Sequence, residues 1–459
     1  MKAFRILATL IVLVALFGFE MNNVHTVQAA FPFTYTSGFQ VQNIDPNNDA
    51  IVTIDFYDST TGAKVTGAEI KDTIAKATST TYLTLTGLPS GFQGSVVISS
   101  SAQVASVVNI NGIGAGGNAW ASYVGAISGG SPVLIPLLMA NNSGYNTWFS
   151  VQNTGGTATD VSVAYSDGKT NSKPGLQPGA SWVFDQTTEG HTAKIFSATV
   201  TASGGGQLAA TVIEENNSIM FAYNGFTAGS QTVAIPLINS NNAGYATGTQ
   251  IMNTGGNQTT VTVSYIPSVA GTACTETQTI QGGASATFTL YAFSPGNPTP
   301  PGSSGYSTTC AGGARFVGSA IVSANSAGMN LVAISNQLKP GVNGEANNDF
   351  DPSTATSQVV LPLIMDRNSG WSTGFNIMNV GTTADINCTF TGTTHTVSQT
   401  GVAQYAALNN LQGNTIAYKY VGSATCTASA GGKLVAVVNE LNLAPGANLM
   451  VYEGIPVGQ

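Results

Sequence analysis

Hydrophobic and polar residues alternate strictly in three stretches that lie far apart in the chain. Val161, Val163 and Tyr165 form one such set, and the same alternation recurs at 261–265 and 386–390. A period of two sends successive side chains to opposite faces of a β-strand, so the apolar members of each set are expected on one buried face. The pattern therefore predicts short, half-buried strands rather than helices.

A longer pattern surrounds each of these stretches and shows that the chain is repetitive. Each copy opens with an apolar strand of the form V-x-[IL]-P-L, which occurs at 133–139, 233–239 and 359–365. Each copy closes with a second apolar block, which occurs at 196–215, 316–337 and 420–440. Residues 94–110 match the closing block, which locates a fourth, N-terminal copy. In that copy Phe31-Pro32-Phe33 is interpreted as the counterpart of Ile-Pro-Leu.

The copies are about 100 residues long, with turn residues between some seven expected strands. This is the sequence signature of an antiparallel β-sandwich. We predict an all-β chain of four tandem immunoglobulin-like β-sandwich domains after a signal peptide. A β-propeller is disfavoured because its blades are shorter, at about 40–50 residues. The predicted boundaries are 1–29 for the signal peptide, 30–131 for repeat 1, 132–231 for repeat 2, 232–357 for repeat 3 with its long loop and linker at 294–310 and 339–357, and 358–459 for repeat 4.

An Asn-x-Gly segment followed by an aromatic residue stands after the opening strand of repeats 2, 3 and 4. Asn and Gly tolerate left-handed backbone angles, so the segment is expected to be a turn. Its aromatic residue is expected to cap one end of the sandwich. Aromatic rings beside amides also suit stacking on sugar rings, which is the less favoured interpretation. The residues in question are Asn141, Asn142, Tyr145, Asn241, Asn242, Tyr245, Asn368 and Trp371.

Composition, charge and the N-terminal segment indicate where the protein acts and which partners are disfavoured. Only 7% of the 459 residues are charged, against roughly 25% in an ordinary soluble protein. Lys2 and Arg5 precede an apolar run from Ile6 to Phe19, and small residues at Val27-Gln28-Ala29 suit cleavage. The run is shorter than the ~20 residues of a membrane-spanning helix. We therefore expect an exported mature chain that begins near Ala30 and has no membrane-spanning segment. Its mildly acidic surface disfavours nucleic acid and anionic membranes as partners.

Four cysteines allow three disulfide pairings. In the alignment of the repeats, Cys388 takes the inward position of Val163, and Cys426 takes that of Val200. Cys274 and Cys310 both fall in the long loops expected in repeat 3. The alignment thus favours the bridges Cys274–Cys310 and Cys388–Cys426, which export to an oxidising compartment permits. Neither pair has CxxC spacing, so a zinc site or redox motif is disfavoured.

Few residues are candidates for catalysis or metal binding. His191 and His395 stand in polar contexts and are interpreted as surface histidines. Glu214, Glu215 and Glu440 could pair as the carboxylates of a glycoside hydrolase, but they occupy equivalent repeat positions, which favours a structural role. Two acidic clusters offer oxygen ligands for calcium, although solvated turns are favoured because neither matches a known calcium loop. The clusters contain Asp45 and Asp49 in one case, and Glu345, Asp349 and Asp351 in the other.

Two sequence blocks together, G-[YW]-x-T-x-x-x-[VI]-x-N-x-G and GSA-x-V followed by LVAVVNE, resemble tandem immunoglobulin-like repeats in secreted surface proteins of filamentous bacteria of the Chloroflexota type. The resemblance covers residues 132–459 well and 31–131 loosely. It implies a surface-layer, sheath or matrix component and identifies no ligand.

These observations lead us to expect a non-enzymatic extracellular structural protein, secreted or held at the cell surface. It would be a building block that associates with itself or with other cell-surface proteins. An adhesin that binds glycans through the aromatic-amide loops is the alternative. A hydrolase is disfavoured because no repeat looks specialised for catalysis. No cofactor is expected, with calcium as the open alternative.

Overall fold

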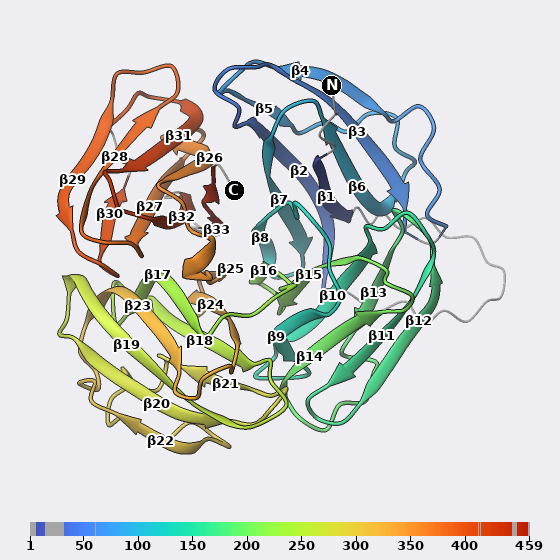
Figure 1. The fold of residues 1–459 in the computed structure, drawn as a ribbon. Coiled ribbons are helices and arrows are strands. Elements are labelled where there is room, and N and C mark those ends of the chain that lie inside the picture. The colour runs from blue at the N-terminus through green and yellow to red at the C-terminus, as the bar shows by residue number, and fades with distance from the viewer. Residues whose placement is uncertain are drawn as a thin grey trace. The chain divides into compact units, whose positions relative to one another are not determined.

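The computed structural model describes residues 6–13, 32–59, 61–411, 413, 415–442 and 448–457. Their regular secondary structure is β-strand, apart from one short 3-10 turn, η1 (Pro352–Thr354). The strands form eight antiparallel sheets (Figure 1), which confirms the expected all-β architecture. Among these residues no helix is long and apolar enough to cross a membrane. The chain divides into two compact units, residues 1–227 and 228–459.

One strand order recurs four times along the chain. When the eight strands common to all four repeats are numbered along each repeat, one sheet has the order first-sixth-third-fourth and the other has the order fifth-second-seventh-eighth. Each repeat therefore has eight principal strands, one more than the sequence predicts. Repeat 3 adds β22 (Ser304–Thr308) at a sheet edge, and repeat 4 adds the short β34 (Ile455–Pro456). The identical order is the structural counterpart of the repeated sequence blocks.

Unit 1 holds repeats 1 and 2. The strands of repeat 1 are β1 (Ile6–Leu13), β2 (Phe33–Asn43), β3 (Ala50–Asp58), β4 (Ile70–Ile74), β5 (Ser79–Tyr82), β6 (Gln93–Ser100), β7 (Val104–Gly114) and β8 (Gly117–Val124). The strands of repeat 2 are β9 (Val133–Met139), β10 (Asn146–Asn153), β11 (Thr159–Tyr165), β12 (Thr170–Leu176), β13 (Ser181–Asp185), β14 (Ile195–Ala202), β15 (Leu208–Glu215) and β16 (Met220–Asn224).

Unit 2 holds repeats 3 and 4. The strands of repeat 3 are β17 (Thr232–Ser240), β18 (Ala246–Asn253), β19 (Thr259–Ala270), β20 (Cys274–Ile280), β21 (Ser285–Phe288), β22 (Ser304–Thr308), β23 (Phe316–Ala324), β24 (Leu331–Lys339) and β25 (Asn343–Asn348). The strands of repeat 4 are β26 (Gln358–Asp366), β27 (Trp371–Asn379), β28 (Ala384–Phe390), β29 (Thr396–Val402), β30 (Ala407–Leu411), β31 (Tyr420–Ala428), β32 (Leu434–Asn442), β33 (Leu449–Glu453) and β34 (Ile455–Pro456).

The alternating stretches form half-buried strands as predicted. Along β11 the residues are buried and exposed in turn, with Val161, Val163 and Tyr165 on the buried face, and β28 has the same pattern. These apolar faces contribute to cores that lie between two sheets. The core of repeat 3, for example, combines Val261 of β19 with Ile251 of β18 from the opposite sheet. Burial of one face explains why the sequence alternates here.

The opening strands contain a nearly continuous apolar run because both of their faces are buried. Every residue of β9 is buried, as are nearly all residues of β17 and β26. The ladder between β9 and β14 shifts register between Ile135 and Leu138, where Pro136 stands, because proline has no N–H to donate. The pairings of β17 and β26 shift register at the corresponding proline. The V-x-[IL]-P-L signature thus encodes a buried strand with one interruption.

Three sequence interpretations need correction. Phe33 begins β2, whereas the place of the opening strand, next to β6, is taken by β1, so the alignment of Phe31-Pro32-Phe33 with Ile-Pro-Leu is wrong. The expected linker at 339–357 contains β25, the last strand of repeat 3, and the expected long loop at 294–310 contains β22. Of the predicted signal peptide, Ile6–Leu13 is described as β1, and the cleavage point at Ala29 lies outside the described residues.

Candidate functional site

The repeated Asn-x-Gly-aromatic segment is a two-residue hairpin turn. In repeat 2, Asn142 and Tyr145 exchange both backbone hydrogen bonds, each 2.9 Å long. Between them Ser143 has φ 52° and Gly144 has φ 87°. Two successive positive φ values define the type I′ turn, which joins the opening strand of the repeat to its second strand. The expectation of left-handed backbone angles is confirmed.

Repeats 3 and 4 contain the same turn. Ala243 and Gly244 have φ values of 51° and 88°, and Ser369 and Gly370 have φ values of 51° and 87°. Glycine occupies the second position in all three turns because it adopts this conformation without a Cβ penalty. The sequence motif is therefore explained by chain geometry before any ligand is invoked.

The aromatic residues of these turns are half-buried and contact their own repeat. Tyr145 meets Phe221 edge-on, with ring centroids 5.9 Å apart. Burial raises the pKa of Tyr145, and the charge of Glu214 raises it further. The Lys339 ammonium lies 5.6 Å from the centre of the Tyr245 ring. Trp371 is also half-buried. The Tyr145 and Tyr245 rings thus contact residues of their own repeats, and their capping of one end of the sandwich stays a prediction.

The amides beside these rings are engaged inside the protein. Asn142 donates to Met139 Sδ at 3.3 Å. Asn242 donates to Asn239 Oδ1 at 2.9 Å and accepts from Arg315 Nε at 3.0 Å. Asn241 donates to two backbone carbonyls at 2.9 and 3.0 Å. The backbone bridge of Asn368 to Trp371 repeats that of the other turns. Within unit 1 and within unit 2, these interactions stabilise the turn itself.

Glu215 lies at a buried polar site between repeats 1 and 2. The carboxylate accepts from the Tyr35 hydroxyl at 2.6 Å and from Trp148 Nε1 at 3.1 Å. Burial raises the pKa of Glu215 to about 7, against the lowering effect of these two donors. Tyr35 comes from β2 of repeat 1, whereas Trp148 and Glu215 come from adjacent strands of repeat 2. The sequence drew attention to Glu215 but contained no local signal for Tyr35.

Of the other two carboxylates proposed for hydrolysis, Glu214 faces away from this site and Glu440 belongs to repeat 4 in unit 2. Glu214 and Glu215 are neighbours in β15, so their side chains leave opposite faces of the sheet. Glu214 stands opposite Thr147, and Glu440 stands opposite Thr373 in repeat 4. Both carboxylates are completely buried. The equivalent positions agree with the structural role that the repeat alignment favours.

A polar hollow of about 180 Å³ adjoins Glu215 on the surface of unit 1. It has acidic, amide and hydroxyl walls, formed by residues that include Asn146, Trp148, Asp185, Thr187 and Asn217. This volume is below the ~300–1,000 Å³ typical of small-molecule sites. The indole N–H of Trp148 already bonds Glu215, and Asp185 already accepts from Thr187 at 2.8 Å. The hollow has room for a small polar group.

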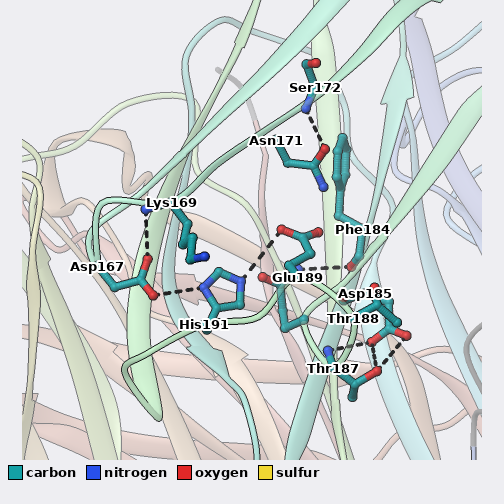
Figure 2. Close-up of polar contacts among 11 residues, drawn as sticks. Asp167, Lys169, Asn171, Ser172, Phe184, Asp185, Thr187, Thr188, Glu189 and His191 are labelled. Atoms are coloured by element: carbon teal, nitrogen blue, oxygen red, sulfur yellow. Dashed lines mark hydrogen bonds and ion pairs between the residues drawn. The ribbon is translucent and has the colours of Figure 1, made fainter.

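The His191 side chain is buried, which corrects its interpretation as a surface residue. Its side chain is 0% exposed and lies between two carboxylates, as Figure 2 shows. Nδ1 is 3.0 Å from Asp167 Oδ2, and Nε2 is 3.7 Å from Glu189 Oε2. The ring stacks on Phe196 with centroids 4.0 Å apart. Burial lifts the pKa of Asp167, but the hydrogen bond with His191 and further donors outweigh it and lower the pKa overall.

The position of this cluster in the repeat identifies its role. His191 also packs edge-on against Tyr165, at 4.7 Å. In repeat 3 the equivalent tyrosine, Tyr265, meets Phe293 edge-on at 5.0 Å instead. A catalytic base needs a ring nitrogen within reach of a substrate. The enclosed His191 ring instead fills a core position that an aromatic ring fills in repeat 3. His395, half-buried, lies 5.1 Å from the Phe390 ring in repeat 4.

The acidic clusters considered for calcium bind protein groups. Asp45 accepts from the backbone N–H groups of Asn47 and Asn48, which form an ordinary turn.

Asp349 of the second cluster is buried and accepts from Ser335 at 2.9 Å, and burial raises its pKa. Glu345 lies in β25, Asp351 caps η1, and Asp49 accepts from the Lys76 N–H. In the part of the chain that is described, no group of three His, Cys, Asp or Glu side chains is placed to hold a metal ion.

The cysteines form the bridges Cys274–Cys310 and Cys388–Cys426, the pairing that the repeat alignment favours. Cys388 and Cys426 are direct cross-strand partners in β28 and β31. The same positions hold Val163 and Val200 in repeat 2, and Val263 and Val322 in repeat 3. Cys274 begins β20 rather than lying in a loop, and Cys310 follows β22.

Comparison with known proteins adds little to this description. No protein-family model matches the chain, and no curated protein sequence matches it. A solved structure described as the "tetra-tandem repeat in extending region of large adhesion protein" is similar at 13% identity. The match covers 99% of this chain and 100% of that chain, with a TM-score of 0.10. A TM-score this low carries no argument about fold or function.

Proposed function

We propose that the chain is a non-enzymatic extracellular structural protein, a building block of a surface layer, sheath or matrix that associates with itself. We further infer that each repeat is an immunoglobulin-like β-sandwich. The pairing of the second strand with the fifth, and of the third with the sixth, supports this inference. The pairing of the sixth strand with the first departs from the usual immunoglobulin order.

The observation that carries the proposal is the way consecutive repeats are joined inside each unit. In unit 1, β8 and β16 lie side by side, and Asn224 donates to the Val124 carbonyl at 2.7 Å. The hydrophobic core of repeat 1 extends to Ile213 and Met220 of repeat 2. Apolar contact and hydrogen bonding together resist bending, whereas a flexible linker would allow the repeats to move independently.

Unit 2 is joined in the same way by different residues. β25 and β33 lie side by side, and the Asn348 N–H donates to Glu453. Ser319 donates to the Tyr405 carbonyl at 2.6 Å. Leu237 of repeat 3 packs in one apolar cluster with Val437 and Val451 of repeat 4. Stiff paired repeats with a weakly charged surface suit close lateral packing, since like-charge repulsion between neighbours is small.

Cell fractionation tests the proposal. Cells of the source organism are separated into medium, envelope and cytoplasm, and an antibody against residues 228–459 locates the chain. The proposal expects the chain in the envelope or matrix fraction, in assemblies that withstand washing with salt. Recovery only from the cytoplasm, or only as a monomer in the medium at all concentrations, contradicts it.

Adhesion to glycans is the second candidate, and the polar hollow beside Glu215 favours it. Asn146 of the hairpin-turn region, Asp185 and Asn217 present polar groups at one surface site. Binding of the purified chain to a glycan array, abolished by Asp185→Ala together with Asn217→Ala, supports this function. Binding that is absent, or unchanged in the double variant, removes the hollow as the glycan site.

A further inference from the structure

Repeat 1 differs from the others in where its opening strand comes from. In repeats 2, 3 and 4, the opening strand and the second strand are joined directly by the type I′ turn. In repeat 1 the opening position is held by β1, which pairs with β6 over eight residues from Ile6–Ser100 to Leu13–Gln93. β1 is separated from β2 by residues 14–32.

β1 coincides with the apolar run of the predicted signal peptide. The inference drawn here therefore rests on the proposed function, because export is the step that removes this segment. Once residues 1–29 are cleaved, the side of β6 that β1 covers is left without a partner. Val96 and Ile98, both 0% exposed, lie on that strand. Loss of β1 therefore exposes a row of backbone N–H and C=O groups of β6 beside an apolar core.

The exposed edge of β6 has no charged residue or proline that would prevent pairing with another strand. Natural edge strands are commonly protected by charged residues or proline. The opposite edge of the same sheet, β4, contains Lys71 and Asp72, and the edge strand β12 of repeat 2 contains Lys173 and Pro174. The sequence of β6, QGSVVISS, contains neither a charge nor a proline. This edge therefore favours pairing with another strand.

We propose that β6 of the mature chain pairs antiparallel with β6 of a second copy of the chain, in a two-fold symmetric dimer. With Val97 on the symmetry axis, Val96 of one copy stands opposite Ile98 of the other. Directly opposite residues of an antiparallel pair point to the same face, so both apolar rows stay on the core side. The contact is isologous and closes on itself. β1 demonstrates that an eight-residue antiparallel strand fits along this edge.

The test uses the chain secreted by its native host, with N-terminal sequencing to establish where it begins. Sedimentation over a concentration series is expected to show a monomer–dimer equilibrium. A Val97→Cys variant is expected to form a covalent dimer under mild oxidation, because the four native cysteines are already paired. A synthetic peptide with the sequence of residues 6–13, carrying terminal lysines for solubility, is expected to bind one per chain and convert dimer into monomer.

Two lysine variants separate edge pairing from other association. Val97→Lys places like charges opposite each other on the axis and is expected to weaken the dimer about fivefold or more. Thr53→Lys is the matched control, since Thr53 is a half-buried residue on the neighbouring strand β3, opposite Ser99, and lies away from the edge. The control is expected to leave the dimer unchanged.

The outcomes distinguish this inference from the proposed function. A secreted chain that lacks residues 1–29 but stays monomeric, or a dimer that Val97→Lys and the peptide leave intact, overturns the β6 pairing while the surface role stands. A secreted chain that retains residues 1–29 also overturns the β6 pairing, because β1 then still covers the edge, and it leaves the surface role standing.

Discussion

Tyr35 and Glu215 are 180 residues apart and share a hydrogen bond of 2.6 Å between two different repeats. Tyr35 is completely buried and Glu215 nearly so. Trp148 donates to the other oxygen of the same carboxylate. A buried carboxyl group is stable only when such donors satisfy it. The junction between repeats 1 and 2 therefore depends on a polar contact as well as on apolar packing.

Removal of the tyrosine hydroxyl is expected to destabilise unit 1. Tyr35→Phe leaves one oxygen of the Glu215 carboxyl without its donor, at a cost of about 1–3 kcal/mol. Calorimetry should show a lower transition temperature for unit 1 and little change for unit 2. Tyr82→Phe is the control, because its hydroxyl bonds Asp72 at a half-buried position. Equal effects of the two substitutions would contradict the special role of the junction.

Stability is expected to fall as the pH rises from 5 to 8. Burial raises the pKa of Glu215, Glu276 and Glu453 to about 7 in the folded protein, above the value of 4.5 for an exposed glutamate. The folded state then binds more protons than the unfolded state. Protonation of these glutamates therefore stabilises the folded state fully below pH 4.5. This contribution to the free energy of unfolding is lost as the pH rises through 7. Each group contributes about 2.5 kcal/mol to the difference between pH 5 and pH 8.

Glu276→Gln isolates one of these contributions. Urea unfolding at pH 5 and pH 8 should show a smaller pH effect on unit 2 in the variant than in the parent chain. Glu69→Gln serves as the control. Hydrogen bonds from Lys64 and then Lys71 lower the pKa of Glu69 to about 2, so it does not titrate between pH 5 and pH 8. A pH effect that Glu276→Gln leaves intact would exclude Glu276 as a source.

The type I′ turn predicts that Gly144→Ala lowers the free energy of unfolding. A Cβ at this position meets no atom within 4 Å, but φ is +87°, so Gly144→Ala is strained by its backbone alone. We expect a loss of about 1–2 kcal/mol in the free energy of unfolding. Gly156→Ala is the matched control, because its Cβ also meets nothing within 4 Å and its φ is not positive. Similar losses in both variants would argue against turn geometry as the reason for the motif.

The Cys388–Cys426 bridge can be replaced by the valine pair that repeats 2 and 3 have at the same positions. A double substitution to valine should restore the pair seen at Val163 and Val200, and repeat 4 should keep its fold. The bridge spans 38 residues, so its loss is expected to lower stability by about 3–4 kcal/mol in the chain-entropy model. Denaturant unfolding measures the loss, and circular dichroism checks the fold. Loss of the β signal in the double variant would refute the equivalence of the repeats.

The sequence is most informative where a residue is constrained by its neighbours in the chain. Alternation predicts which face of β11 is buried, because the period of a strand is a local property. The Asn-x-Gly segment predicts a turn with positive φ for the same reason. Repetition then extends both predictions, since equivalent positions such as Val163 and Cys388 fall in equivalent strands.

The sequence is least informative where distant segments meet. β25, with the sequence NGEANN, reads as a polar linker, yet it is buried because it lies beside β33 of the next repeat. His191 reads as a surface residue in a polar stretch, yet Asp167 and Glu189 enclose it. Tyr35, which donates to Glu215, lies in another repeat. No pattern within a few residues encodes such contacts.

Electron tomography of intact cells of the source organism, with gold-labelled antibody against residues 228–459, tests the central claim most directly. The account predicts label along a continuous layer, sheath or matrix outside the cell. Label confined to the cell interior, or a cell surface free of label while the chain is being made, would contradict it.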